Sequence, residues 1–310
     1  MRTKNPVKIE LSNGEAIFHS TRNGKRTADI FETKRPHSEP ILKWAGGKQW
    51  LTPLLNSIIS KENYGTYFEP FLGAGSCFFA ISPEKAVISD LNEELIGVYE
   101  VLKKDVKGLI LKMSRFSNNS QTFYRVRAQS PRSEVGKAAR LIYLNKTCWN
   151  GLYRVNRDGN FNVPFGQHKN PKICDKQKLI EASVRLRSAK IENCDFSKRI
   201  RSAKNGDVVY FDPPYITGHQ NNGFHMYNSK LFSWEDQLRL SEIGQELKKK
   251  RVHVVISNAD HEEIKRLYTD FHYYRIFRKS LIGGKNARRG LISEALITNY
   301  PLFGIESKVK

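Results

Sequence analysis

The stretch Asp212-Pro213-Pro214-Tyr215 places a carboxylate, two rigid carbonyls and an aromatic ring next to one another. An exocyclic amine on a heteroaromatic ring is a poor nucleophile, because its lone pair is delocalised into the ring. The carboxylate of Asp212 and the carbonyl of Pro213 could accept both N–H bonds of such an amine and stabilise the charge that develops on its nitrogen. Tyr215 could stack on the ring, as side chains do on an extruded base. A strand-to-turn junction without chemistry is the alternative interpretation.

The residues before this tetrapeptide predict the element that positions it. Val208, Val209 and Phe211 form a short apolar run that is typical of a buried strand. The prolines end the strand, because proline offers no N–H to a sheet and disfavours helix in the residue before it. Ligands of open α/β sheets bind beyond the carboxyl ends of the strands. The strand, both prolines and the tyrosine together favour the chemical interpretation over the plain turn.

A glycine turn follows another predicted strand. Residues 67–71 predict the strand, Gly73 and Gly75 the turn, and residues 76–81 the start of a helix. A dinucleotide fingerprint would need a third glycine where Phe78 stands, which argues against NAD as the cofactor.

Carboxylates end two further predicted strands. Residues 86–89 lead to Asp90, which is placed to hydrogen-bond a ribose diol. A short strand at 189–192 leads to Asp195 and Phe196, which could bind an adenine amine and stack on its ring. With the glycine turn, these features imply a nucleoside-type cofactor without a pyrophosphate, and S-adenosylmethionine fits.

The segment ILKWAGGKQW contains one more candidate turn. Two glycines stand between Trp44, a stacking face, and Lys48, a positive charge. A backbone turn of this kind can approach a ligand closely. A solvent-exposed turn before a helix is the alternative.

Residues 93–146 have a helical apolar period, and a hairpin is predicted after them. Residues 153–155 and 161–163 alternate around a turn that contains Asp158-Gly159, a strong hairpin signal. Arginine and amide side chains read guanine and adenine edges, and the ribbon carries Arg154, Asn156, Arg157, Asn160, Asn162 and Gln167. A DNA-reading ribbon and a merely solvated hairpin are both open interpretations.

The remainder predicts alternating helices and strands. Helices are expected at 176–188, 234–250 and 262–268, and strands at 253–257, 273–277 and 294–300. The polar loop 216–232 is suited to closing over a substrate, and the basic, glycine-rich segment 278–290 to contacting phosphates.

Composition points to a polyanionic partner. The 310 residues contain 52 Lys and Arg against 31 Asp and Glu, a net charge of +21. Nucleic acid is the first candidate, and a generic basic surface is the alternative. Four widely spaced cysteines predict free thiols in a reducing compartment, with neither a disulfide frame nor a zinc site. With no signal peptide or membrane span in sight, a cytoplasmic protein is expected.

Taken in order, LKWAGGK, FEPFLGAG, the Asp90 strand, NGLYRVN with FNVPFG, YFDPPY, ISN and SEALITNY resemble the Dam-type DNA adenine methyltransferases. This is the D12 class with the alpha motif order, and the resemblance covers roughly residues 40–300. It implies an α/β fold: a Rossmann-like, seven-stranded methyltransferase sheet with an inserted, mostly helical recognition domain carrying a β-hairpin. It implies S-adenosylmethionine as methyl donor and adenine N6 in duplex DNA as acceptor.

The resemblance also assigns residues. The catalytic tetrapeptide is Asp212, Pro213, Pro214 and Tyr215. Cofactor-contacting positions are Trp44, Lys48, Phe71, Gly73, Gly75, Asp90, Asp195, Phe196 and Asp212. Positions that contact a GATC site are Lys43, Asn150 and Arg154. Trp149 stands where the best-known members carry Tyr, and Gln167 where some carry Arg, so the recognised sequence is open.

These observations lead to one hypothesis with alternatives. We expect a polar extension over 1–38, a catalytic domain over 39–103 and 189–301, and a recognition domain over 104–188. Residues 7–11 and 16–18 could form a hairpin in the extension or belong to a flexible arm. The expected activity is adenine-N6 methylation of duplex DNA within GATC by base flipping, with no metal. A cognate restriction endonuclease is a candidate partner. Methylation of cytosine N4 or RNA adenine, and a non-catalytic DNA-binding protein, are the alternatives.

Overall fold

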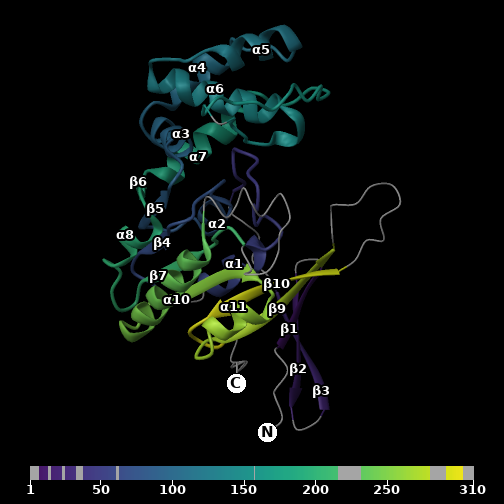
Figure 1. Cartoon of the computed structure of the whole chain (residues 1–310), viewed down its shortest axis with the longest axis vertical. Coiled ribbons are helices and arrows are strands. Elements are labelled where there is room, and N and C mark those ends of the chain that lie inside the picture. The colour runs from purple at the N-terminus through teal and green to yellow at the C-terminus, as the bar shows by residue number, and fades with distance from the viewer. Residues whose placement is uncertain are drawn as a thin grey trace. The chain divides into compact units, whose positions relative to one another are not determined.

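Strands and helices alternate along much of the chain in the computed structural model (Figure 1). The structure describes residues 7–12, 15–22, 25–32, 38–60, 63–156, 158–215, 232–279 and 291–302. Backbone contacts divide the chain into two units. The first comprises Met1–Arg35, Pro53–Pro70 and Ser197–Lys310, and the second Pro36–Thr52 and Phe71–Phe196.

The first unit is built on a mixed sheet. Its strands are β1 (Val7–Ser12), β2 (Glu15–Arg22), β3 (Lys25–Glu32), β4 (Tyr67–Glu69), β7 (Val208–Phe211), β8 (His253–Ala259), β9 (His272–Lys279) and β10 (Leu291–Thr298). They lie in the order β3-β2-β1-β9-β10-β8-β7-β4. The central strands β4, β7 and β8 run parallel, and β10 is antiparallel to both β8 and β9. The helices are α1 (Thr52–Ile59), α8 (Phe196–Ile200), α10 (Trp234–Lys249) and α11 (Glu262–Leu267).

Strand β7 is the buried strand that the apolar run predicted. All four of its residues are buried. At its start, the buried carboxylate of Asp207 accepts the N–H of Thr66 at 2.8 Å and the N–H of Lys204 at 2.9 Å. This carboxylate joins the segments that lead into β4 and β7. It therefore helps to set the register of this parallel pair of strands, upstream of Asp212.

The N-terminal segment forms part of the sheet. The hairpin interpretation is confirmed, because β1 and β2 pair antiparallel. The flexible-arm alternative is wrong, since β1 also pairs parallel with β9, from Val7 opposite Tyr274 to Glu10 opposite Phe277. Strand β3, which pairs with β2, was missed.

The second unit combines a parallel strand pair with helices. β5 (Ala86–Asp90) and β6 (Ala189–Asn193) pair in parallel, with Asp90 opposite Asn193. The helices are α2 (Ser76–Ile81), α3 (Glu93–Lys104), α4 (Val106–Met113), α5 (Ser120–Ala128), α6 (Glu134–Thr147), the 3₁₀ turn η1 (Trp149–Gly151) and α7 (Lys176–Leu186). The long helical region breaks at Asp105, Asn119 and Ser133, whose side chains accept N–H groups of the next helix. The α/β fold expected from the sequence is confirmed.

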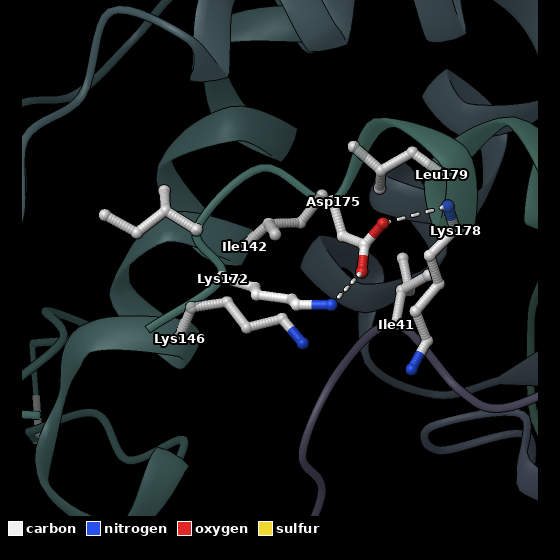
Figure 2. A pocket seen from close by; sticks show the side chains of 8 residues that line it. Ile41, Ile142, Lys146, Lys172, Asp175, Lys178 and Leu179 are labelled. Carbon is white, nitrogen blue, oxygen red and sulfur yellow. Dashed lines mark hydrogen bonds and ion pairs between the residues drawn. The ribbon is translucent and has the colours of Figure 1, made fainter. Parts of the chain in front are cut away.

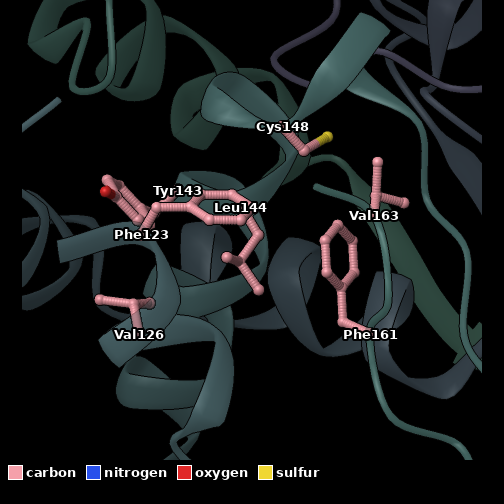
Figure 3. Packing of buried hydrophobic residues seen from close by; sticks show 7 residues of the cluster. All are labelled: Phe123, Val126, Tyr143, Leu144, Cys148, Phe161 and Val163. Atoms are coloured by element: carbon pink, nitrogen blue, oxygen red, sulfur yellow. The ribbon is translucent and has the colours of Figure 1, made fainter. Parts of the chain in front are cut away.

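The predicted hairpin is present and is anchored on helices α5 and α6. Val155 and Phe161 form an antiparallel bridge, and Asn156 N–H donates to the carbonyl of Asn160 at 2.8 Å. Phe161 and Val163 are buried against Phe123, Val126, Tyr143, Leu144 and Cys148 (Figure 3). The intervening polar residues are left on the outer side of the ribbon, as alternation requires.

Three predicted features fall wholly or largely outside the described residues: the loop at 216–232, the basic segment at 278–290 and Arg157. Within the described part of the chain, no helix is long and apolar enough to cross a membrane. All four cysteines are free thiols.

Candidate active site

The Asp212-Pro213-Pro214-Tyr215 corner directly follows β7 in the first unit. Asp212 and Tyr215 are half-buried, and Pro213 is buried. The hydroxyl of Tyr215 donates to Oε2 of Glu294 on β10 at 2.9 Å. Burial, with the negative charges of Asp212 and Glu294, raises the pKa of Tyr215 well above its ordinary value. The tyrosine therefore stays a neutral donor, and Glu294 fixes the position of its ring.

Buried polar pairs lie behind this corner. The hydroxyls of Tyr210 and Ser257 are 2.9 Å apart. Asn258 donates to Oε1 of Gln237 at 3.1 Å, and both amides are fully buried. Buried polar groups that are hydrogen-bonded to each other rigidify a core and specify one packing arrangement. These two pairs therefore fix how β7, β8 and α10 pack. Glu294 and Gln237 were missed in the sequence, although a glutamate within an otherwise buried strand is a usable signal.

The glycine turn lies in the second unit, in front of α2. Gly73 and Gly75 have φ of 49° and 70°, a left-handed conformation that side chains disfavour. The N–H of Leu72 donates to the carbonyl of Ser89 at 3.0 Å. The hydroxyl of Tyr99 donates to the carbonyl of Gly73 at 2.8 Å. The turn is thereby held on both β5 and α3.

Asp90 sits at the end of β5 and bonds the glycine turn directly. Its Oδ2 accepts the N–H of Gly73 and its Oδ1 the N–H of Asn92, each at 2.9 Å. Burial raises the pKa of Asp90, and the backbone N–H groups oppose that rise. Each carboxylate oxygen keeps further acceptor capacity, so the carboxylate can take hydroxyl donors while it supports the turn.

The remaining predicted cofactor residues of the second unit are Trp44, Lys48, Phe71, Asp195 and Phe196. A Cβ added to Gly73 would lie 3.2 Å from Cδ1 of Trp44, so the indole covers the turn. Lys48 is 6% exposed, and its Nζ donates to the carbonyl of Gly46 at 2.8 Å. Phe71 stacks on Phe196 with ring centroids 5.1 Å apart. Asp195, next to Phe196, is half-buried. The second unit thus contains every predicted cofactor residue except Asp212, which belongs to the first unit.

The three predicted DNA contacts are all exposed residues of the second unit. Asn150 has a φ of 54° within η1. Arg154 donates through Nε to Oδ1 of Asn162 at 2.8 Å across the hairpin. Trp149 beside them is 54% exposed, and Gln167 has a φ of 50°.

Asn145, which the sequence reasoning missed, joins two of these contacts. Its Oδ1 accepts the N–H of Lys43 at 2.9 Å, and its Nδ2 donates to the carbonyls of Lys43 and Gly151 at 2.8 and 3.0 Å. The amide is almost fully buried. A Cβ on Gly151 would come within 2.6 Å of Lys43. The backbones that carry Lys43 and Asn150 are therefore clamped to each other.

A small pocket on the second unit is lined by lysines and aliphatic side chains (Figure 2). Its lining residues are Ile41, Ile142, Lys146, Lys172, Ile173, Asp175, Lys178 and Leu179. Lys178 pairs with Glu39 at 2.9 Å and Lys172 with Asp175 at 3.7 Å. Burial first, then the positive charges of Lys178 and Lys43, lower the pKa of Lys146 to about 8.

Lys146 should therefore make stability depend on pH. Its pKa is about 8 in the folded chain against an ordinary 10.5, so the unfolded chain binds more protons between these values and stability rises with pH there. Below pH 8 the cost of the buried charge is fully present. We expect Lys146→Met to raise the free energy of unfolding by about 1–2 kcal/mol at pH 7, a gain that shrinks towards pH 10.5.

Chemical denaturation from pH 6.5 to 10.5 measures this difference, with the exposed Lys107→Met as the matched control. A wild-type-to-variant difference that stays constant across that range would rule out charge burial as its cause.

The strands, glycine turn and helices together define a Rossmann-like α/β fold of the methyltransferase kind. The chain belongs to the D12 class N6 adenine-specific DNA methyltransferases, whose family model matches residues 44–281.

Curated relatives agree with this family. The chain is 40% identical to the Type II methyltransferase M1.LlaDCHI of Lactococcus lactis subsp. cremoris, over 88% of this chain and 99% of that protein. It is 36% identical to the Type II methyltransferase M.MjaIII of Methanocaldococcus jannaschii, over 84% and 99%. It is 31% identical to the DNA adenine methylase of Haemophilus influenzae, over 83% and 92%. The family favours adenine in DNA over cytosine N4 or RNA adenine, and an enzyme over a non-catalytic binder.

Proposed function

We propose that the protein methylates N6 of adenine within GATC in duplex DNA, using S-adenosylmethionine and flipping the adenine out of the helix. The observation that carries the proposal is the corner after β7. There a half-buried aspartate, a buried proline and a tyrosine held by Glu294 follow one another. The family match supports adenine as the base and DNA as the polymer.

The second unit fits the cofactor. The turn at Gly73 is covered by Trp44, and Asp90 can accept from a ribose diol while it supports the turn. The Oγ of Ser76 is buried without a hydrogen-bond partner among the described residues, so a polar ligand group could satisfy it. Phe78, fully buried, stands where a pyrophosphate-binding turn would need glycine. S-adenosylmethionine supplies an electrophilic sulfonium methyl when bound. It would be held by Trp44, Lys48, Phe71, Gly73, Gly75, Asp90, Asp195, Phe196 and Asp212.

The corner then acts on the adenine. Tyr215 offers a stacking face for the flipped base, which offsets part of the few kcal/mol that unstacking costs. The carboxylate of Asp212 and the carbonyl of Pro213 accept the two N6–H bonds, so the nitrogen lone pair points away from the ring plane. Both acceptors stabilise the positive charge that grows on N6 during transfer. Because Pro213 is rigid and Tyr215 is fixed by Glu294, little reorganisation accompanies the reaction.

Recognition of the site belongs to Lys43, Asn150 and Arg154. Asn145 supports this role by fixing the backbones that carry the first two. We assign residues 104–188 to DNA recognition, and 39–103 with 189–301 to catalysis. A restriction endonuclease acting on the same sequence is a proposed partner, supported by the Type II naming of the two relatives described above.

The test is transfer of labelled methyl from S-adenosylmethionine to unmethylated duplexes with and without GATC. We expect labelled N6-methyladenine only with GATC, together with protection from a methylation-sensitive GATC nuclease. A 2-aminopurine placed at the target adenine should brighten as the base unstacks. Label in cytosine or RNA would refute the reaction. Label without protection at GATC would refute GATC as the target. An unchanged 2-aminopurine fluorescence would refute the flipping step.

A further inference from the structure

Tyr153 belongs to the hairpin, yet its ring lies against the candidate cofactor site of the same unit. Its ring centroid is 5.0 Å from that of Trp44, and the two planes are 26° apart, a stacked arrangement. Its hydroxyl donates a hydrogen bond to Oε2 of Glu94 in the first turn of α3. Phe161, across the ribbon, meets the same ring edge-on at 6.2 Å. The Tyr153 side chain thus contacts its own hairpin at Phe161, the segment that carries Trp44, and the first turn of α3 at Glu94.

The contacts of Tyr153 with Trp44 and with Glu94 each connect it, through one further residue, to Asp90. Through Trp44 the tyrosine reaches Gly73, whose N–H is bonded to one oxygen of Asp90. Through Glu94 it reaches the start of α3, whose N-cap residue donates its own N–H to the other oxygen. A stacked aromatic pair adds interaction energy beyond its buried area, enough to couple two sites several-fold.

On the DNA side, Tyr153 immediately precedes Arg154, one of the proposed base contacts. Arg154 is itself bonded across the ribbon to Asn162. The Tyr153 ring and the Arg154 side chain thus extend from adjacent positions of the same ribbon.

We propose that Tyr153 is a positioning residue that couples cofactor binding to DNA recognition. This inference rests on the proposed function and names a regulation of the same site. A cofactor that orders Trp44 also orders the Tyr153 ring and the hairpin, so DNA then binds with less ordering cost. Linkage requires the reverse as well, with DNA tightening the cofactor by the same factor.

The experiment measures this coupling factor in Tyr153→Ala, Tyr153→Leu and Tyr153→Phe. The dissociation constant of S-adenosylhomocysteine, which cannot react, is determined with and without a saturating GATC duplex. The dissociation constant of the duplex is determined with and without that ligand. Tyr124→Ala is the matched control, because Tyr124 is an aromatic residue of the same unit that packs on Phe123 and Arg127.

We expect a coupling factor of about tenfold in the wild type and in Tyr124→Ala, within the usual range for linked sites. Tyr153→Ala and Tyr153→Leu should bring it below about twofold, whereas Tyr153→Phe, which keeps the stack, should retain most of it. Tyr153→Leu also serves if the alanine variant does not fold.

Several results would overturn the inference. The first is a coupling factor of one in the wild type. The second is a coupling factor that is unchanged in both Tyr153→Ala and Tyr153→Leu. The third is weaker binding of both S-adenosylhomocysteine and the duplex in these variants with the coupling factor preserved. Methyl transfer by the wild type is assayed on the same duplex. Absent transfer refutes the proposed function, whereas normal transfer with unaltered coupling refutes only the role of Tyr153.

Discussion

Asp212→Asn is expected to lower kcat for methyl transfer by about 10²–10³-fold, the usual loss when a preorganised electrostatic partner of the reacting atom is removed. The amide keeps one acceptor oxygen but loses the negative charge, and its NH₂ would face the N–H groups of adenine N6. Binding of the GATC duplex should change by less than about tenfold, because these interactions gain strength mainly as charge develops on nitrogen. Single-turnover transfer separates this chemical step from binding and product release.

The matched control is Asp270→Asn, an exposed aspartate of the same unit, which should transfer methyl groups at the wild-type rate. Near-normal single-turnover rates in Asp212→Asn would remove the carboxylate from the mechanism. Asp212→Ala serves as a second variant, because it also removes the remaining acceptor oxygen.

Asp90→Ala is expected to weaken binding of S-adenosylhomocysteine by about 100-fold. The loss of about 2–3 kcal/mol combines a charge-assisted hydrogen bond to the ligand with support of the Gly73 turn. The variant would leave the N–H groups of Gly73 and Asn92 without the carboxylate that now binds them. Asp90→Asn keeps a single acceptor oxygen, so its affinity for S-adenosylhomocysteine should lie between those of the wild type and of Asp90→Ala. Equilibrium dialysis or calorimetry with the isolated ligand measures the effect.

Asp105→Ala is the control for Asp90→Ala. Asp105 also accepts a backbone N–H, that of Gly108 at 2.9 Å, but it caps α4 and is exposed. The Asp105→Ala variant should lose about 1 kcal/mol of stability, with no change in its affinity for S-adenosylhomocysteine. Wild-type affinity in a folded Asp90→Ala protein would show that this carboxylate does not hold the ligand.

Local signals made much of the fold predictable. The apolar run at 208–211, Gly73 with Gly75, and the Asp158-Gly159 turn each determine a conformation within a few residues. The breaks between α3, α4, α5 and α6 were also encoded, since each new helix starts after an Asp, Asn or Ser cap. They were missed because the apolar period continues across them.

Long-range partners could not be predicted in this way. Asn145 bonds Lys43, which lies 102 positions earlier in the chain, and Glu294 on β10 bonds Tyr215. A single amide or carboxylate carries no local mark of such a partner. The stack of Trp44 on Tyr153 likewise depends on the folded chain bringing two distant turns together.

The pairing of β1 with β9 has a consequence for how the protein behaves in concentrated solution. Residues 7–10 occupy the edge of β9 from Tyr274 to Phe277. A chain shortened to start at residue 39, near the beginning of the family match, would present that edge uncovered. Open strand edges template pairing between molecules. The N-terminal strands thus move the edge of the described sheet from β9 to β3.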